Sequence, residues 1–292
     1  MKRRYDPAMH PADPLVACWP ARLELGFERR GDPTRLVHRV HHGPLRVQKP
    51  LHPEGPELCH AIVLHPPAGI VGGDRLDLDI TLGENAQALL TTPGAGKWYR
   101  SPAEGRVWAE QRVRLTLGAG ATAEWLPQES IVFDGAEARM ETRVELASGA
   151  RYLGIETLCL GRRASGEKFA RGCLRLASDI QLDGRPLWRE RGIIDGGSPL
   201  LDSPIGMAGF SVCSTVLAAG IDLPPEALAG CRAAKPDEAG AQTGVSAMPQ
   251  LFVGRYLGHS AESARRWFVA LWQHVRPVVI GREAAVPRIW NT

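Results

Sequence analysis

Two carboxylates, Glu129 and Asp134, flank a short apolar run, and acids at this spacing could support acid–base chemistry. Paired acids act as general acid and general base, as in glycoside hydrolysis, when both carboxyl groups face one substrate bond. The sequence does not fix the distance between these two groups. Ion-paired ends of a strand explain the same residues equally well.

Further acids stand beside turns. Asp74 closes a loop, residues 64–74, that holds two prolines and three glycines. Proline fixes φ and glycine permits positive φ, so this loop has a defined bend. Glu156 and Glu167 bracket a Gly-Arg turn that contains Arg162. Each acid is a candidate site residue, although a solvated turn is the simpler explanation.

Motifs of common enzymes are missing. The segment 91–101 places glycines before Lys97, but a phosphate loop needs Ser or Thr after the lysine, and Trp98 stands there. The chain has no Gly-x-Ser-x-Gly elbow, no HExxH, and no GxGxxG after a strand. The sequence therefore favours a binding or assembly protein over an enzyme.

The elements that must position these residues are predicted to be short strands. Residues 76–82 alternate apolar and polar side chains, which is typical of a half-buried strand. A weak repeat starts at Asp79, Arg114 and Arg143, and each copy is a strand, a turn with glycine or asparagine, and a second strand. Units repeated every 30 residues or so bury their faces on one another. We expect a mainly β fold with a solenoid-like or layered body of short stacked strands.

The few helices are expected chiefly near the C-terminus. Residues 225–233 predict a short helix, and the polar stretch 235–246 predicts a surface loop. A helix is expected around 260–276, capped by Ser260 and ended by Pro277. Its apolar face is Trp267, Phe268, Leu271, Trp272 and Val275. We expect a flexible tail at 1–18 and a single domain at 19–292.

Composition excludes several partners. The formal charge of +3 is small for 292 residues and both signs are mixed along the chain, so nucleic acid and membrane surfaces are not indicated. No apolar run reaches the length of a membrane span, and no signal peptide is recognisable. No pair of the six cysteines has CxxC spacing. A reduced, cytoplasmic protein is expected.

Four ordered segments together resemble the UreD family of urease accessory proteins, called UreH in some organisms. They are Leu64–Asp74 (LHPPAGIVGGD), Thr91–Ser101 (TTPGAGKWYRS), Trp125–Glu129 (WLPQE) and Leu160–Glu167 (LGRRASGE). The resemblance extends from about Arg22 to Pro224. Ala68 stands where the family often has glycine.

The resemblance implies a mostly β, solenoid-like body without catalytic activity. It also implies a role in urease maturation, in which the protein binds apo-urease and UreF, and UreF recruits the GTPase UreG. An internal passage would carry nickel towards the urease active site. We therefore expect no tightly bound cofactor, nickel in transit, and neither nucleic acid nor membrane as a partner.

The matching segments supply the candidate residues for that passage. The expected acids are Asp74, Glu129, Asp134, Glu156 and Glu167, with Thr91, Thr92 and Gln128 as neutral oxygens. Lys97 and Arg162 would hold these acids or contact partners, and Tyr99 and Arg100 would line the passage or contact partners. Carboxylates bind nickel more weakly than imidazole or thiolate. Such a passage would attract a dication and still release it.

Two alternatives stay open. A β-helical polysaccharide hydrolase or lyase would use Glu129 and Asp134, although aromatic residues at only 6% offer few sugar-stacking surfaces. An interaction module unconnected with urease is the other alternative.

Overall fold

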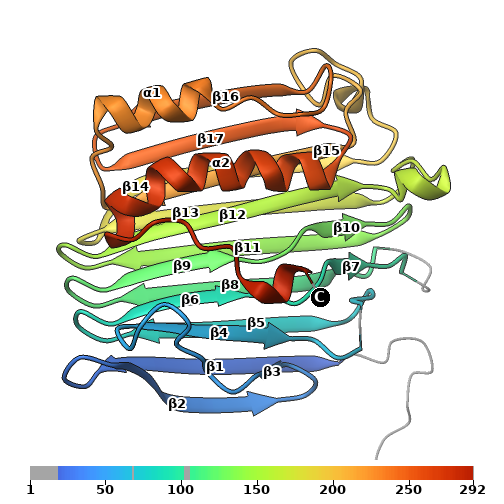
Figure 1. The fold of residues 1–292 in the computed structure, drawn as a ribbon. Helices are drawn as coiled ribbons and strands as arrows, with labels where there is room; N and C mark the ends of the chain where they lie inside the picture. Colours follow the sequence, from blue (N-terminus) through green and yellow to red (C-terminus); the bar gives the residue numbers. More distant parts are fainter. Residues whose placement is uncertain (1–18, 68, 102–105, 292) are drawn as a thin grey trace, which may run out of the picture.

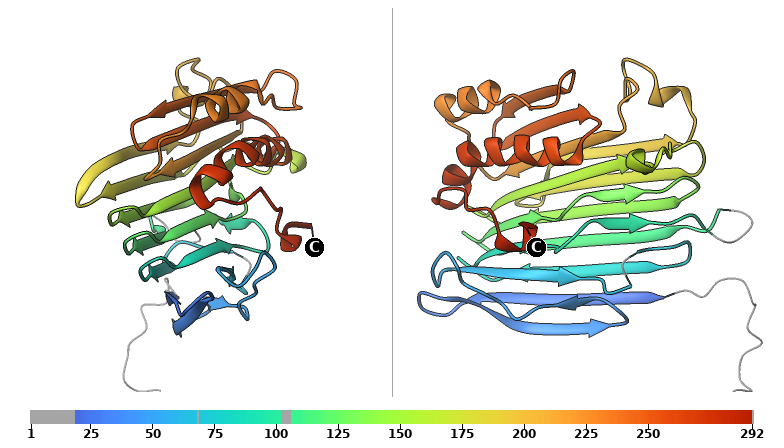
Figure 2. Two further views of the ribbon diagram at one scale, coloured as in Figure 1. Left: turned by 60° about the vertical axis from the view of Figure 1, so that its left-hand side comes forward. Right: turned by 45° about the vertical axis from the view of Figure 1, so that its right-hand side comes forward.

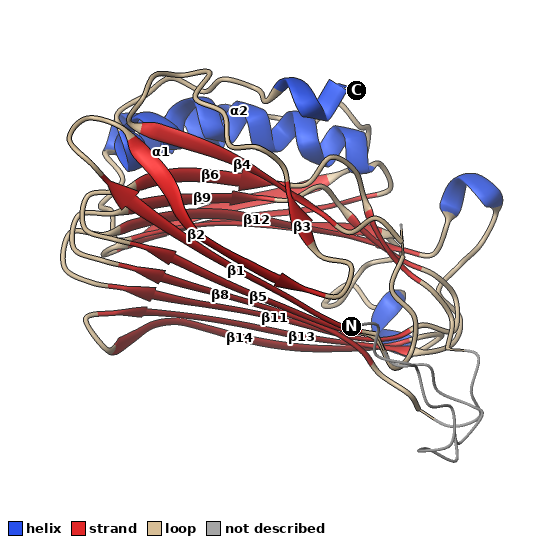
Figure 3. Ribbon diagram, turned by 90° about the horizontal axis from the view of Figure 1, so that it is seen from below, coloured by secondary structure: helices blue, strands red, loops and turns tan. Residues whose placement is uncertain are grey.

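Two stacked β-sheets form the body of the protein, and the helices cover one of them (Figures 1 and 3). The computed structural model describes residues 19–67, 69–101 and 106–291. The predicted tail at 1–18 and Ala68 lie outside the described residues. The strands stack along one axis from the N-terminal to the C-terminal part of the chain (Figure 2).

The first sheet has seven strands, in the order β14-β13-β11-β8-β5-β1-β2. Their bounds are β1 Pro20–Arg29, β2 Thr34–His42, β5 Arg75–Leu82, β8 Ala109–Leu117, β11 Glu137–Leu146, β13 Cys173–Leu182 and β14 Arg185–Asp195. The second sheet has ten strands, and its main path runs β16-β17-β15-β12-β9-β6-β4-β3. Its bounds are β3 Arg46–Val47, β4 Leu58–Leu64, β6 Gln87–Thr91, β7 Gly96–Trp98, β9 Thr122–Leu126, β10 Ser130–Val132, β12 Arg151–Leu160, β15 Val212–Ala219, β16 Gln242–Met248 and β17 Leu251–Gly258.

The repeat predicted from the sequence corresponds to the repeating pair of strands in the structure. Asp79, Arg114 and Arg143 are direct partners on the parallel strands β5, β8 and β11. The second strands of the copies, β6, β9 and β12, are parallel neighbours in the ten-stranded sheet. The prediction of a mainly β body of stacked strands is therefore confirmed.

The turns between the two sheets explain the glycine and asparagine of the repeat. Asn85, Gly120 and Gly149 hold the same position in successive copies, and all three have positive φ (55°, 65° and 69°). Side chains with a Cβ rarely adopt this region, and asparagine tolerates it best after glycine. An Asp183-Gly184 turn joins β13 to β14, with both turn residues at positive φ.

Two apolar clusters hold the layers together. One fills the space between the sheets and includes Leu78, Leu115 and Val144. The other lies between the ten-stranded sheet and the helices, and includes Leu153 and Phe252. Helix α2 (Ala261–Ile280) contributes its whole predicted apolar face to this second cluster.

Helix α2 is longer than expected. The Oγ of Ser260 accepts a hydrogen bond from the backbone N–H of Ser263 at 3.1 Å, as the cap prediction requires. The prediction that Pro277 ends the helix is wrong, because the helix continues to Ile280. Val279 and Ile280 are buried in the second cluster, and this packing holds the last turn. Gly281, at φ 72°, ends the helix instead.

The C-terminal third corrects one further expectation. The predicted helix 225–233 is present as α1 (Pro225–Ala233). The stretch 235–246 is not wholly a loop, since residues from Gln242 onward form the edge strand β16. Backbone pairing with β17 makes a strand here even though few of its side chains are apolar. Three short 3₁₀ helices complete the described chain: η1 (Arg163–Ser165), η2 (Pro199–Leu201) and η3 (Arg288–Asn291).

Candidate functional site

A cavity of about 400 Å³ lies between the two sheets, near the loops that follow β4, β6 and β9. The seven-stranded sheet contributes Leu78 of β5 and Glu190 of β14 to its wall, and the ten-stranded sheet contributes Glu156 of β12 and Thr215 of β15. His65, from the loop after β4, also lines it. The wall therefore combines apolar, neutral polar and acidic groups, which suits a water-filled space.

The structure places some of the expected passage residues on this wall: Thr92, Lys97, Gln128 and Glu156. The Thr92 hydroxyl donates to the carbonyl of Gly94 at 3.1 Å and accepts from the backbone N–H of Gln128 at 3.0 Å. These bonds fix the two loops that border the cavity.

Among the predicted passage acids, Glu156 is the one that lines the cavity. Burial raises the pKa of its carboxyl to about 7, and the neighbouring Glu190 carboxylate acts in the same direction, while Arg255 opposes the shift. A carboxyl near neutral pKa can exchange a proton for a cation at modest cost. It is therefore the acid of the cavity best suited to a transient contact.

Asp74 and Thr91 have structural contacts instead. The Asp74 carboxylate accepts from the backbone N–H groups of Val71 (2.9 Å) and Trp19 (3.3 Å), so it fixes its own loop. The Thr91 hydroxyl donates to the carbonyl of Leu126 at 2.6 Å and accepts from the indole N–H of Trp290 at 2.7 Å. Both side chains hold loops near the cavity, and neither is among the residues that line it.

Glu129 lies on the helix side of the ten-stranded sheet. Its carboxylate pairs with Arg265 of α2 at 2.6 Å. This contact ties the loop before β10 to the first turns of α2.

Asp134 and Glu167 lie together at the strand ends. Asp134 pairs with Arg171. Burial would raise the pKa of the Asp134 carboxyl, but the hydrogen bonds from Arg171 lower it. Glu167 pairs with Arg162 at 2.7 Å, which lowers its pKa, and its other oxygen accepts from the backbone N–H of Asp134 at 3.2 Å. Arg162 thus holds an acid, as expected. The ring of Phe133 lies 4.6 Å below the Arg162 guanidinium.

Tyr99 and Arg100 pack over the same corner. The Tyr99 ring meets the Phe133 ring edge-on at 4.8 Å. A Cβ on Gly69 would lie 1.9 Å from the Tyr99 ring, so only glycine fits there with this ring in place. The Arg100 side chain covers Gly135. Neither Tyr99 nor Arg100 lines the cavity, whereas Gly69 does.

The geometry does not favour the polysaccharide hydrolase. Glu129 and Asp134 are each in an ion pair with an arginine, and neither lines the cavity. The lowered pKa of Asp134 keeps it ionised, which is unsuited to a general acid.

Sequence reasoning missed an ion pair beside the cavity, of which Glu190 lines the wall and Arg255 does not. Arg255 of β17 pairs with Glu190 of β14 at 2.7 Å and donates to the Thr215 hydroxyl at 2.7 Å. Glu190 and Arg255 lie 65 residues apart and belong to different sheets. Their strand patterns gave no local signal of this contact.

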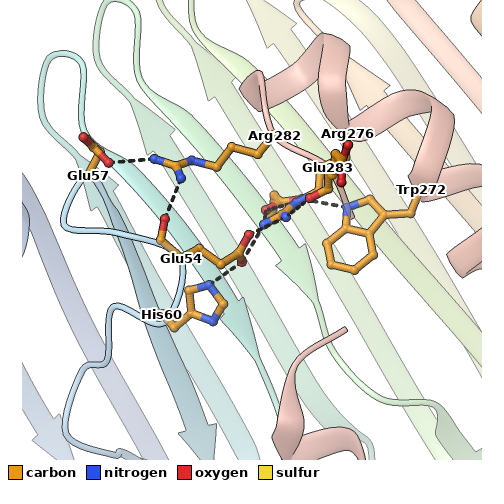
Figure 4. A network of polar contacts seen from close by, with 8 residues as sticks. Glu54, Glu57, His60, Trp272, Arg276, Arg282 and Glu283 are labelled. Atoms are coloured by element: carbon orange, nitrogen blue, oxygen red, sulfur yellow. Dashed lines mark hydrogen bonds and ion pairs between the residues drawn. The ribbon is translucent and has the colours of Figure 1, made fainter. Parts of the chain in front are cut away.

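A second missed group ties α2 to the body (Figure 4). Arg276 is fully buried and bonds both Glu124, at 3.0 Å, and Glu54, at 2.6 Å. The indole N–H of Trp272 donates to Glu124 at 2.8 Å, and His60 contacts Glu54 at 2.9 Å. Burial opposes the shift, but the bonds from His60 and Arg276 lower the pKa of Glu54 to about 2.

No group of three or more His, Cys, Asp or Glu side chains among the described residues is arranged to hold a metal ion. None of the helices in that part of the chain combines the length and apolarity needed to span a bilayer.

Known proteins resemble the chain along nearly its whole length. The family model described as UreD urease accessory protein matches residues 20–291. A urease accessory protein UreD of Dechloromonas aromatica is 54% identical over 94% of this chain and 95% of its own length. Proteins of the same name from Azoarcus sp. (50% identical, covering 98% and 97% of the two chains) and Janthinobacterium sp. (48%, covering 93% and 91%) are similar to it as well. The chain therefore belongs to the UreD family of urease accessory proteins.

Proposed function

We propose that this protein is a non-catalytic scaffold of urease maturation that binds apo-urease and UreF and passes nickel through the cavity between its sheets. UreF would bring UreG, and nickel would be cargo in transit, with no tightly bound cofactor. The family membership supports the accessory role. We further propose a cytoplasmic location.

The observation that carries the nickel route is the position of Glu156. It lies on the wall of an internal cavity, and the other predicted acids lie in contacts that hold loops or α2. Carboxylates among hydroxyl and amide oxygens bind Ni²⁺ weakly. Weak binding at such a group lets a cation leave as readily as it enters.

The route is tested by Glu156→Gln in cells that also express urease and its accessory proteins. Glutamine keeps the shape of the side chain and removes its charge, so we expect urease activation at limiting nickel to fall about tenfold, with normal amounts of folded protein. Glu145→Gln is the matched control, because Glu145 forms an ion pair with Arg143 on β11 and both side chains are exposed. Full activation with Glu156→Gln would remove this residue from the route.

Partner binding is tested by co-expression with UreF and size-exclusion chromatography. We expect one complex that contains both proteins and captures UreG when it is added. Separate elution of this protein and UreF would contradict the scaffold proposal.

A further inference from the structure

One ion pair bridges the two sheets at the cavity. Glu190 stands on β14, the edge strand of the seven-stranded sheet, and Arg255 stands on β17 of the ten-stranded sheet. Their side chains are 35% and 43% exposed, so the pair also reaches solvent. It thus lies between the cavity and the outside.

Arg255 belongs to a row that leads to Glu156. On the antiparallel strands β12, β15 and β17, Glu156 is paired with Thr215, and Thr215 is paired with Arg255. Directly opposed residues of such strands are about 5 Å apart at Cα. Because Arg255 donates to the Thr215 hydroxyl at 2.7 Å, its guanidinium is held one strand away from Glu156. The guanidinium also lies 5.7 Å from the centre of the Trp188 ring.

We propose that Arg255, which contacts the wall residues Glu190 and Thr215, is the counter-ion of the cavity's acids: it is bound to Glu190 until a divalent cation enters and displaces it. This inference rests on the proposed nickel route. Arginine side chains stay charged in proteins, so Arg255 can leave Glu190 only by moving. The part of its surface that is exposed lets it move into water at low cost.

A tethered counter-ion makes binding transient. While a cation occupies the cavity, Glu156 and Glu190 both face it, and Arg255 remains close by on its own strand. Its return competes with the cation at a high effective concentration. The competition weakens cation binding, as passage requires. When the cation has left, Arg255 again neutralises the charge of Glu190.

The test is calorimetric titration of the full-length protein with Ni²⁺ alone, at fixed ionic strength. Arg255→Gln removes the competitor, so Ni²⁺ should bind about tenfold more tightly than to the wild type. Glu190→Gln removes a carboxylate and leaves Arg255 unpaired, so binding should weaken by a similar factor. Both changes break the same ion pair. A purely structural role would therefore shift both affinities in one direction.

Arg191→Gln is the matched control. Arg191 follows Glu190 on β14 and pairs with Asp179 at 2.6 Å. The affinity of the Arg191→Gln protein for Ni²⁺ should equal that of the wild type. Arg255→Lys keeps the charge and should restore weak binding.

Equal affinities of the wild type and Arg255→Gln, or no Ni²⁺ binding by Arg255→Gln, would overturn the proposal. If Arg255→Gln does not fold, an unchanged or tighter affinity in Glu190→Gln overturns it by itself. The nickel route has its own test, urease activation with Glu156→Gln. A loss of activation there, together with equal affinities here, would remove only the role of Arg255.

Discussion

Arg276→Met should be among the most damaging single changes in this protein. The Arg276 side chain is 0% exposed and bonds Glu124, which is also 0% exposed. Methionine fills much of the same volume but leaves the Glu124 carboxylate without its cation. Burial already raises the pKa of Glu124 against the pull of Arg276.

The expected loss follows from that burial. Removing one partner of a buried ion pair costs about 3–5 kcal/mol of the free energy of unfolding. A single domain has only about 5–15 kcal/mol in total. The midpoint of thermal unfolding should fall by roughly 10 °C.

Urea unfolding followed by tryptophan fluorescence measures this loss, and Trp272 is a local probe because the Arg276 guanidinium lies 4.6 Å from its ring. The control is Arg266→Met, whose pair with Asp237 has side chains 53% and 51% exposed. Exposed pairs contribute about 0–1 kcal/mol. In the double variant with Glu124→Leu, part of the stability should return, because the fully buried Glu124 carboxylate is then absent and Glu54 keeps its contact with His60. A loss with Arg276→Met no larger than the control would refute the reasoning that these groups are shielded from water.

Three other outcomes are expected. Since the pKa of Glu156 is raised to about 7 in the folded protein, its contribution to stability is complete below about pH 4.5 and is lost as pH rises through 7. In urea unfolding at stepped pH, the wild type should lose at most about 3 kcal/mol over that range relative to Glu156→Gln. A stability difference between the two proteins that does not change with pH would contradict the raised pKa. Gly172→Ala should lower the free energy of unfolding by more than about 2 kcal/mol, because the added Cβ would lie 2.2 Å from the carbonyl oxygen of Ala136. Gly166→Ala has no atom within 4 Å of its added Cβ and should cost about 1 kcal/mol. Equal shifts of the thermal unfolding midpoint in the two variants would contradict this steric account. Ser260→Ala should lower the free energy of unfolding by about 1 kcal/mol through loss of the α2 cap, and Ser203→Ala, in a surface loop, serves as the neutral comparison.

The fold was largely predictable because its information is local. Each repeat carries its own strand pattern and its own turn residue, so Asn85 and Gly120 could be aligned before any pairing was known. The end of α2 could not be predicted in this way. Pro277 is a strong local stop signal, and only the burial of Val279 and Ile280 against distant strands overrides it.

The site was less predictable because its contacts are distant in sequence. Glu156 could be proposed from its place before the Gly-Arg turn, and the structure puts it in the middle of β12. Glu190 and Arg255 could not, since neither stands in an unusual local pattern and their pairing depends on how two sheets close. Acids such as Asp134 and Glu167 looked equivalent to Glu156 in sequence. The structure separates them, because arginines hold the first two and the cavity surrounds the third.

The link between Glu124 and Arg276 also sets the order of events during synthesis. The two residues are 152 positions apart, so at about 5–20 residues per second the ribosome needs roughly 8–30 s to supply the arginine after the glutamate has emerged. Through that interval the outer face of β9 has neither its cation nor the apolar cover of α2. In a nascent chain this face of β9 must therefore stay hydrated, or be shielded by a chaperone, until the last turns of α2 have been synthesised. A chain that ended before Arg276 would leave the buried Glu124 carboxylate without its cation.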